Sequence, residues 1–170
     1  FGFKPTPLQN WAEKVEITDA PQLFILEDVT GAGKTEAALT LTQRLMQKGV
    51  ASGFYFGLPT MATSNAMYKR VTEHYLSMYE TAAEKPSIVL AHGAREMNPL
   101  FQQTVITSGK DNSNYNAEDK TALAECHRWL ADSRKKALLA PVGVGTIDQA
   151  LLAVLPKRHQ SLRLLGLHNK

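Results

Sequence analysis

The segment Asp28-Val-Thr-Gly-Ala-Gly-Lys-Thr35 matches the phosphate-loop pattern of nucleotide-binding proteins at every position except the first. In such a loop the glycines let backbone N–H groups point at phosphate oxygens. Lys34 then reaches the β and γ phosphates, and the Thr35 hydroxyl joins the Mg²⁺ shell. The residues therefore predict an ATP and Mg²⁺ site with Lys34 and Thr35 as catalytic residues and Thr35 as metal ligand. The expected nucleotide contacts are Thr30, Gly31, Ala32, Gly33, Lys34, Thr35 and Glu36.

The first position of this pattern normally holds a small residue, and here it holds Asp28. A carboxylate is unfavourable beside phosphate oxygens, because like charges repel. The sequence leaves two alternatives open for this side chain. It either turns away from the nucleotide or contacts a neighbouring loop.

Elements that would position this loop are visible on both sides of it. Residues 23–26 form a short apolar run typical of a buried strand, and residues 34–48 place apolar side chains on one helical stripe that Gly49 closes. The same reading predicts strands at 53–58, 87–91, 137–144 and 162–167, helices at 62–82, 116–136 and 146–155, and a surface loop at 107–116. Alternating strands and helices indicate an α/β domain over residues 1–170, with a mostly parallel sheet covered by helices on both faces.

Composition places the chain among ordinary globular domains. Its 170 residues are 44% hydrophobic and 21% charged, enough for one core. The net charge of +3 permits nucleic-acid binding without requiring it. A single cysteine, Cys126, indicates a reducing compartment, and no apolar run is long enough to span a membrane, so we expect a cytoplasmic protein. Because the chain begins with Phe1 rather than Met, we interpret it as a piece of a longer polypeptide.

ATP hydrolysis also requires an acid at the end of a neighbouring strand to hold Mg²⁺ and position water. Glu27 and Asp28 lie on the phosphate-loop strand itself, whereas Glu118 and Asp119 open an expected helix. No other apolar run ends in an acidic pair. Taken alone, the chain is therefore expected to bind a nucleotide better than it hydrolyses one.

Several segments together resemble the helicase core of the CRISPR-associated helicase-nucleases of type I interference systems, which are superfamily 2 DNA helicases. The segments are Pro7-Leu-Gln9, Glu27 to Glu36, Leu58-Pro-Thr-Met-Ala-Thr-Ser-Asn-Ala-Met67, Leu90-Ala-His-Gly93 and Gly143-Val-Gly-Thr-Ile-Asp-Gln149. The resemblance implies the first RecA-like lobe, incomplete, of an ATP-dependent enzyme that unwinds target DNA in antiviral defence. The second lobe and the nuclease domain would lie elsewhere in the parent protein, and we expect the fragment alone to be inactive.

The same resemblance assigns roles to individual residues. Gln9 resembles the glutamine that reads the adenine edge, for which an amide offers both a donor and an acceptor. Pro59 and Thr60 are similar to a motif that contacts the DNA backbone, although Thr60 also suits a helix cap. A second such motif comprises Thr146, Asp148 and Gln149, yet the capping-box spacing explains Thr146 and Gln149 equally well. His92-Gly93 is a family signature with no chemistry that the sequence reveals.

The implied partners are single-stranded DNA and, through the parent protein, the CRISPR RNA-guided surveillance complex, with no membrane. Two other classes of function remain open. A P-loop kinase would share the loop and the sheet but would need an acceptor pocket and a basic lid. A nucleotide- or nucleic-acid-binding module without hydrolysis would explain the missing acid directly.

Overall fold

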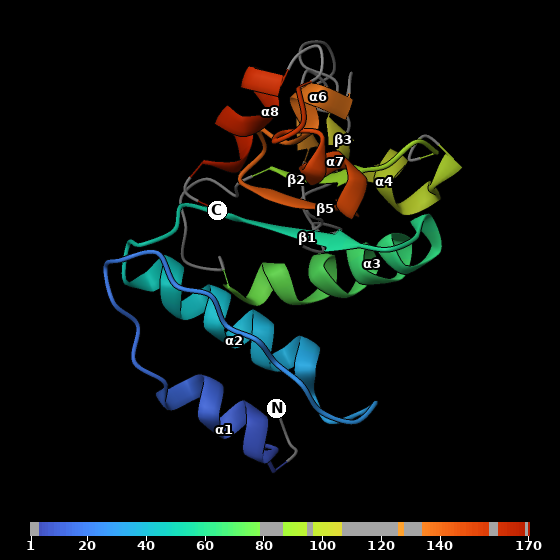
Figure 1. Ribbon diagram of the computed structural model, residues 1–170. Helices are drawn as coiled ribbons and strands as arrows, with labels where there is room; N and C mark the ends of the chain where they lie inside the picture. The colour runs from blue at the N-terminus through green and yellow to red at the C-terminus, as the bar shows by residue number, and fades with distance from the viewer. Residues whose placement is uncertain are drawn as a thin grey trace, which may run out of the picture. The chain divides into compact units, whose positions relative to one another are not determined.

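A computed structural model describes residues 4–78, 87–94, 97–106, 126–127, 134–156, 160–168 and 170. The chain divides into two compact units, the first formed mainly by residues up to Ser52 and the second mainly by residues from Gly53 onward. Figure 1 shows both units with the labels used below. The expected surface loop at 107–116 and most of the expected helix at 116–136 lie outside the described residues.

The first unit contains helices α1 (Pro7–Lys14) and α2 (Lys34–Gln47), which pack against each other. Ala12, Ala37 and Leu41 form the buried centre of this contact. Arg44 adds a hydrogen bond from its guanidinium to the carbonyl oxygen of Ala12 at 2.7 Å. After α2, Gly49 adopts a positive φ of 75°, which confirms the predicted glycine stop.

The run that precedes the phosphate loop differs from the prediction. Residues 23–26 have no strand pairing among the described residues, although a buried strand was expected. Phe24 and Leu26 pack on the α1–α2 core, whereas Leu23 and Ile25 are 86% and 75% exposed. The alternation arises because an extended chain points successive side chains to opposite faces, and only one face meets the helices here.

The second unit is built on a parallel sheet of β1 (Phe54–Leu58), β5 (Val142–Thr146) and β2 (Ile88–Ala91), in that order. The register pairs Phe54 and Ile88 with Val142 from either side. Every residue of β2 and β5 is buried. This pattern is typical of parallel strands with both faces covered, so the α/β class with a parallel sheet is confirmed.

Helices surround this sheet within the second unit (Figure 1). Helix α3 (Met61–Met78) packs across all three strands, α6 (Arg134–Ala137) contacts β2, and α7 (Ile147–Leu151) contacts β1. The remaining elements are α4 (Pro99–Thr104), α8 (Gln160–Leu167), and the short parallel pair β3 (Val105–Ile106) and β4 (Cys126–His127).

Three predicted elements of the second unit are wrong. The expected strand at 162–167 lies in helix α8, because Leu is a strong helix former and this run contains no β-branched residue. The expected strand at 137–144 starts only at Val142, after the short helix α6 and a turn. Within the expected helix at 116–136, Cys126 and His127 instead pair as strand β4.

Candidate nucleotide and nucleic-acid sites

The phosphate loop in the first unit has the backbone that its glycines predict. Gly31 and Gly33 adopt positive φ angles of 86° and 82°, in the left-handed region that glycine occupies without strain. Helix α2 begins directly after them at Lys34. The loop therefore ends on the N-terminus of a helix, where unpaired N–H groups and the helix dipole favour an anion.

Lys34 folds back over this loop. Its ammonium donates hydrogen bonds to the main-chain oxygens of Asp28 at 2.6 Å and Val29 at 2.7 Å. The positive charge is thus held above the loop that would receive phosphate. These residues fit a nucleoside triphosphate. On binding, its phosphate oxygens would replace the two carbonyl oxygens as partners of the lysine.

Asp28 turns onto its own backbone rather than onto a neighbouring loop. Its Oδ1 accepts a hydrogen bond from the N–H of Val29 at 2.8 Å. Short polar side chains often bind local backbone groups in this way. Of the two alternatives that the sequence left open, contact with a neighbouring loop is therefore not the one that the structure adopts.

Gln9 lies against the phosphate loop. A Cβ placed on Gly33 would lie 2.3 Å from Gln9 Nε2, so the absence of a side chain at Gly33 makes room for this amide. Gln9 Oε1 accepts the N–H of Thr6 at 3.0 Å. An amide oxygen has two acceptor sites, so Oε1 would keep one for adenine while it holds this bond.

Thr6 also contacts the phosphate loop, and the sequence analysis did not predict this contact. Its hydroxyl donates to the carbonyl oxygen of Ala32 at 3.1 Å and accepts from the N–H of Gln9. Thr6 and Gln9 form a capping box at the start of α1, with Pro7 as its first residue. The spacing Thr-x-x-Gln followed by a helical pattern is the signal that could have identified Thr6.

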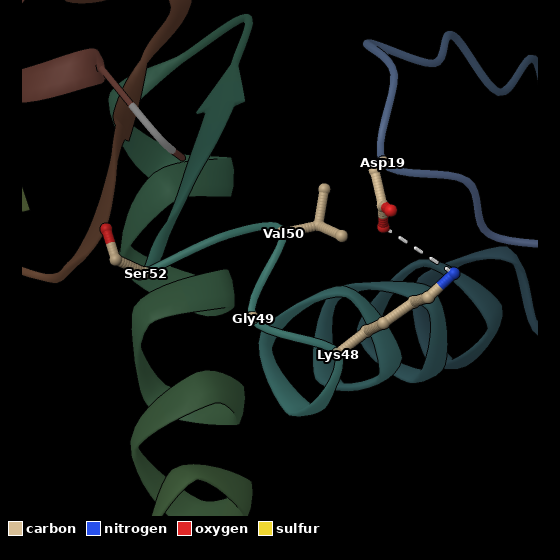
Figure 2. A pocket seen from close by; sticks show the side chains of 5 residues that line it. All are labelled: Asp19, Lys48, Gly49, Val50 and Ser52. Atoms are coloured by element: carbon tan, nitrogen blue, oxygen red, sulfur yellow. Dashed lines mark ion pairs between the residues drawn. The ribbon is translucent and has the colours of Figure 1, made fainter.

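A shallow cavity of about 340 Å³ lies at the other end of α2 (Figure 2). It is lined by Asp19, Lys48, Gly49, Val50 and Ser52, and Lys48 pairs with Asp19 at 3.8 Å. Because α2 has 14 residues, its two ends are separated by about 20 Å at 1.5 Å per residue. The cavity is therefore not the phosphate site.

In the second unit, three predicted motifs follow the three strands of the parallel sheet. Pro59-Thr60 follows β1, His92-Gly93 follows β2, and Thr146 ends β5. The carboxyl ends of parallel strands meet at one edge of a sheet, which is where open α/β sheets bind ligands. The structure therefore brings Thr60, His92 and Thr146 to the same edge.

Thr60 is the cap of helix α3. Its Oγ1 accepts the N–H of Thr63 at 3.2 Å, and its carbonyl oxygen accepts the hydroxyl of Ser64 at 2.8 Å. The residue is exposed. The capping role is confirmed. The exposed start of this 18-residue helix is also compatible with contact to a phosphate.

The capping box predicted at Thr146 and Gln149 does not form. Thr146 precedes α7 without a side-chain cap, and Gln149 instead receives the guanidinium of Arg163 on its Oε1 at 3.0 Å. The same guanidinium also binds the Gln149 carbonyl oxygen. A charged donor from α8 replaces the weaker local bond. Asp148 is exposed, whereas Thr146 and Gln149 are buried.

Tyr55 of β1 packs against the end of β5 that carries Thr146. Its ring lies over Gly143 and Gly145 of β5, where added Cβ atoms would come within 2.7 Å and 2.6 Å of its atoms. Its hydroxyl donates to the carbonyl oxygen of Thr146 at 2.9 Å. Burial raises the pKa of Tyr55 well above its ordinary value, against the opposing charge of Arg163 and with a smaller raising effect of Asp148.

No group of three or more His, Cys, Asp or Glu side chains in the described ranges has the arrangement of a metal site. In that same part of the chain, no helix has the length and apolar character required to cross a membrane.

Comparison with known proteins points to one kind of enzyme. No protein-family model matches the sequence. Over 98% of its length the chain is 37% identical to the CRISPR-associated endonuclease/helicase Cas3 of Escherichia coli K12. Over 100% of its length it is 35% identical to the CRISPR-associated nuclease/helicase Cas3 of Streptococcus thermophilus. It spans only 18% of each of these relatives.

Solved structures agree with the sequence relatives. The chain resembles T. fusca Cas3 with AMPPNP at a TM-score of 0.69 and 33% identity, over 99% of this chain and 17% of that one. For T. fusca Cas3 with ATP the TM-score is 0.60 at 37% identity, over 84% of this chain and 14% of that one. The resemblance indicated by the motifs is therefore confirmed.

Proposed function

We propose, from its similarity to one segment of the CRISPR-associated helicase-nucleases, that this chain is the ATP-binding part of an ATP-dependent DNA helicase. The parent protein would unwind target DNA in the cytoplasm during antiviral defence and carry its nuclease in another part. The observation that supports nucleotide binding most directly is the position of Gln9 against Gly33. This contact places the residue expected to read adenine beside the loop expected to hold the phosphates.

Residues of the first unit would hold ATP. The backbone N–H groups from Gly31 to Thr35 suit phosphate oxygens, and Lys34 would neutralise their charge. Thr35 would supply a hydroxyl ligand to Mg²⁺. ATP supplies the free energy of the reaction, and the chain contributes binding and orientation of the phosphates.

Residues of the second unit would hold single-stranded DNA. Thr60 offers a hydroxyl and the start of a long helix, and Asp148 and Gln149 belong to the segment after β5. Contacts of this kind bind the phosphate backbone without reading bases. The CRISPR RNA-guided surveillance complex is the proposed partner that delivers this DNA to the parent protein.

The experiment measures ATP hydrolysis by the natural protein in its full length, with and without single-stranded DNA. We expect DNA to stimulate hydrolysis and Lys34→Ala to abolish it, because the lysine neutralises charge on the phosphates. A P-loop kinase would show no stimulation by DNA and would phosphorylate an acceptor. Undiminished turnover in Lys34→Ala would overturn the proposal.

A further inference from the structure

His92, directly after β2, is a buried residue with two defined hydrogen bonds. It is 1% exposed. Its Nδ1 accepts the N–H of Ala94 at 3.1 Å, and its Nε2 lies 2.8 Å from Asn65 Oδ1. Because an amide N–H can only donate, Nδ1 carries no proton, and the ring donates from Nε2 to Asn65.

Asn65 joins three elements through one oxygen. It lies on α3, and its Oδ1 accepts both from His92 and from the side-chain amide of Asn98 at 2.9 Å. Asn98 in turn accepts the N–H of Phe101 with its Oδ1 at 3.1 Å, at the start of α4. The end of β2, the first turns of α3 and the start of α4 are thus linked by one set of side-chain hydrogen bonds.

An aromatic contact also joins α3 and α4. Tyr68 of α3 and Phe101 of α4 are both buried, with ring centroids 5.8 Å apart in an edge-to-face arrangement. The bonds that Asn65 accepts from His92 and Asn98 are partly buried, so water replaces a lost partner only in part. The link therefore holds α3 and α4 in one arrangement at this end of the sheet.

Asn65 lies five residues after Thr60, about 7.5 Å along the helix axis at 1.5 Å per residue. We propose that His92 is a positioning residue that fixes the Thr60 end of α3 against the end of β2, so that this sheet edge is preformed for a nucleic-acid backbone. The inference rests on the proposed function, because it assigns to that sheet edge its contact with DNA. His92 itself touches neither nucleotide nor the reacting atoms in this role.

Two substitutions at His92 separate its two bonds. His92→Gln places an amide donor at the position of Nε2 and keeps the bond to Asn65, but it loses the acceptor for Ala94. His92→Asn places an acceptor at the position of Nδ1 and keeps the bond from Ala94, but it loses the reach to α3. Asn65→Leu removes the same link from the side of α3, together with the bond from Asn98, and leaves the bond between His92 and Ala94 in place.

The control is Thr72→Val. It removes a buried hydroxyl that donates to the carbonyl oxygen of Tyr68 within α3 at 2.7 Å. This variant removes one buried hydrogen bond inside α3 without breaking the link of α3 to β2. The measurement is the DNA concentration that half-maximally stimulates ATP hydrolysis by the full-length protein, together with the KM for ATP.

We expect His92→Asn to raise that DNA concentration by about tenfold, as loss of one hydrogen bond implies, and Asn65→Leu to raise it at least as much, with the KM for ATP unchanged. His92→Gln and Thr72→Val should stay within about twofold of wild type. Adding His92→Asn to Asn65→Leu should add nothing further, because Asn65→Leu has already removed the bond from His92.

Wild-type values for both His92→Asn and Asn65→Leu, with normal stimulation by DNA, would overturn this inference and leave the proposed function intact. Equal losses in His92→Gln and His92→Asn would also overturn it, because the bond to Ala94 would then matter and the link to α3 would not. Failure of wild type to respond to DNA would overturn the proposed function and the inference together. If His92→Asn does not fold, Asn65→Leu against Thr72→Val decides the question.

Discussion

The ammonium of Lys34 lies 2.6 Å from the main-chain oxygen of Asp28, the residue that stands where a phosphate loop normally has a small side chain. The Asp28 carboxylate accepts a hydrogen bond from the N–H of Val29, and the residue is exposed. The lysine thus holds the backbone at Asp28, while the Asp28 carboxylate binds the next N–H of the same loop. We expect the Asp28 charge to affect the affinity of this loop for a nucleotide.

Replacing Asp28 with glycine or asparagine should tighten nucleotide binding up to about fivefold, because an exposed charge beside the phosphates contributes below about 1 kcal/mol. Asp28→Asn retains the oxygen that accepts from Val29 and removes only the charge. Titration with a fluorescent ATP analogue measures the effect at low and high salt. Equal affinities at low salt would show that the charge of Asp28 does not reach the phosphates.

Gln9→Glu separates the capping role of Gln9 from its expected recognition of adenine. A glutamate keeps the oxygen that accepts from Thr6, so the capping box and helix α1 persist. It loses the NH₂ donor, so binding of ATP should weaken by about tenfold and discrimination against GTP should be reduced. Competition between the two nucleotides measures this. Gln9→Ala should weaken both binding and thermal stability, and unchanged selectivity in Gln9→Glu would rule out adenine reading.

Gly33→Ala should reduce nucleotide affinity by about tenfold or more. The new Cβ would meet Gln9 Nε2 at 2.3 Å and would sit at a φ of 82°, which itself costs about 1–2 kcal/mol. Gly49→Ala is the matched control, since its φ is 75° and nothing lies within 4 Å of the added atom. Both variants carry similar backbone strain, so a loss of affinity seen equally in both would contradict a specific contact with Gln9.

Tyr55→Phe should lower the free energy of unfolding by about 1–3 kcal/mol, because the buried carbonyl of Thr146 loses its donor. Burial raises the pKa of Tyr55 from its ordinary value of 10.0, so the folded state favours the neutral hydroxyl. That contribution is fully present below pH 10 and is lost as the pH rises above it. The difference between the ultraviolet titrations of wild type and Tyr55→Phe isolates this group, and an ordinary midpoint near pH 10 would contradict its burial.

Local chemistry was predictable from the sequence where neighbours in the chain decide the structure. The helix after Gly33, the stop at Gly49 and the strands β1 and β2 depend on apolar spacing and glycine conformation alone. An adenine-reading role for Gln9 was implied by the family resemblance, but its contact with Gly33 was not predicted. Thr6 carried a local signal, the capping-box spacing, that was overlooked.

Distant partners explain what the sequence did not predict. Gln149 has the spacing of a capping box, but Arg163 lies 14 residues further along and binds it more strongly. The chemistry of His92 depends on Asn65, which is 27 residues away. No local pattern reports such pairs. Residues 162–167 were misassigned because short apolar runs do not distinguish a strand from a helix by periodicity alone.

The most direct test of the nucleotide site is equilibrium titration of the full-length protein with a fluorescent ATP analogue and Mg²⁺. We predict saturable binding by wild type, binding at least about tenfold weaker in Lys34→Ala, and wild-type affinity in Thr60→Ala, whose substitution lies outside the phosphate loop. Equal affinity in wild type and Lys34→Ala would show that the Lys34 loop does not hold the nucleotide.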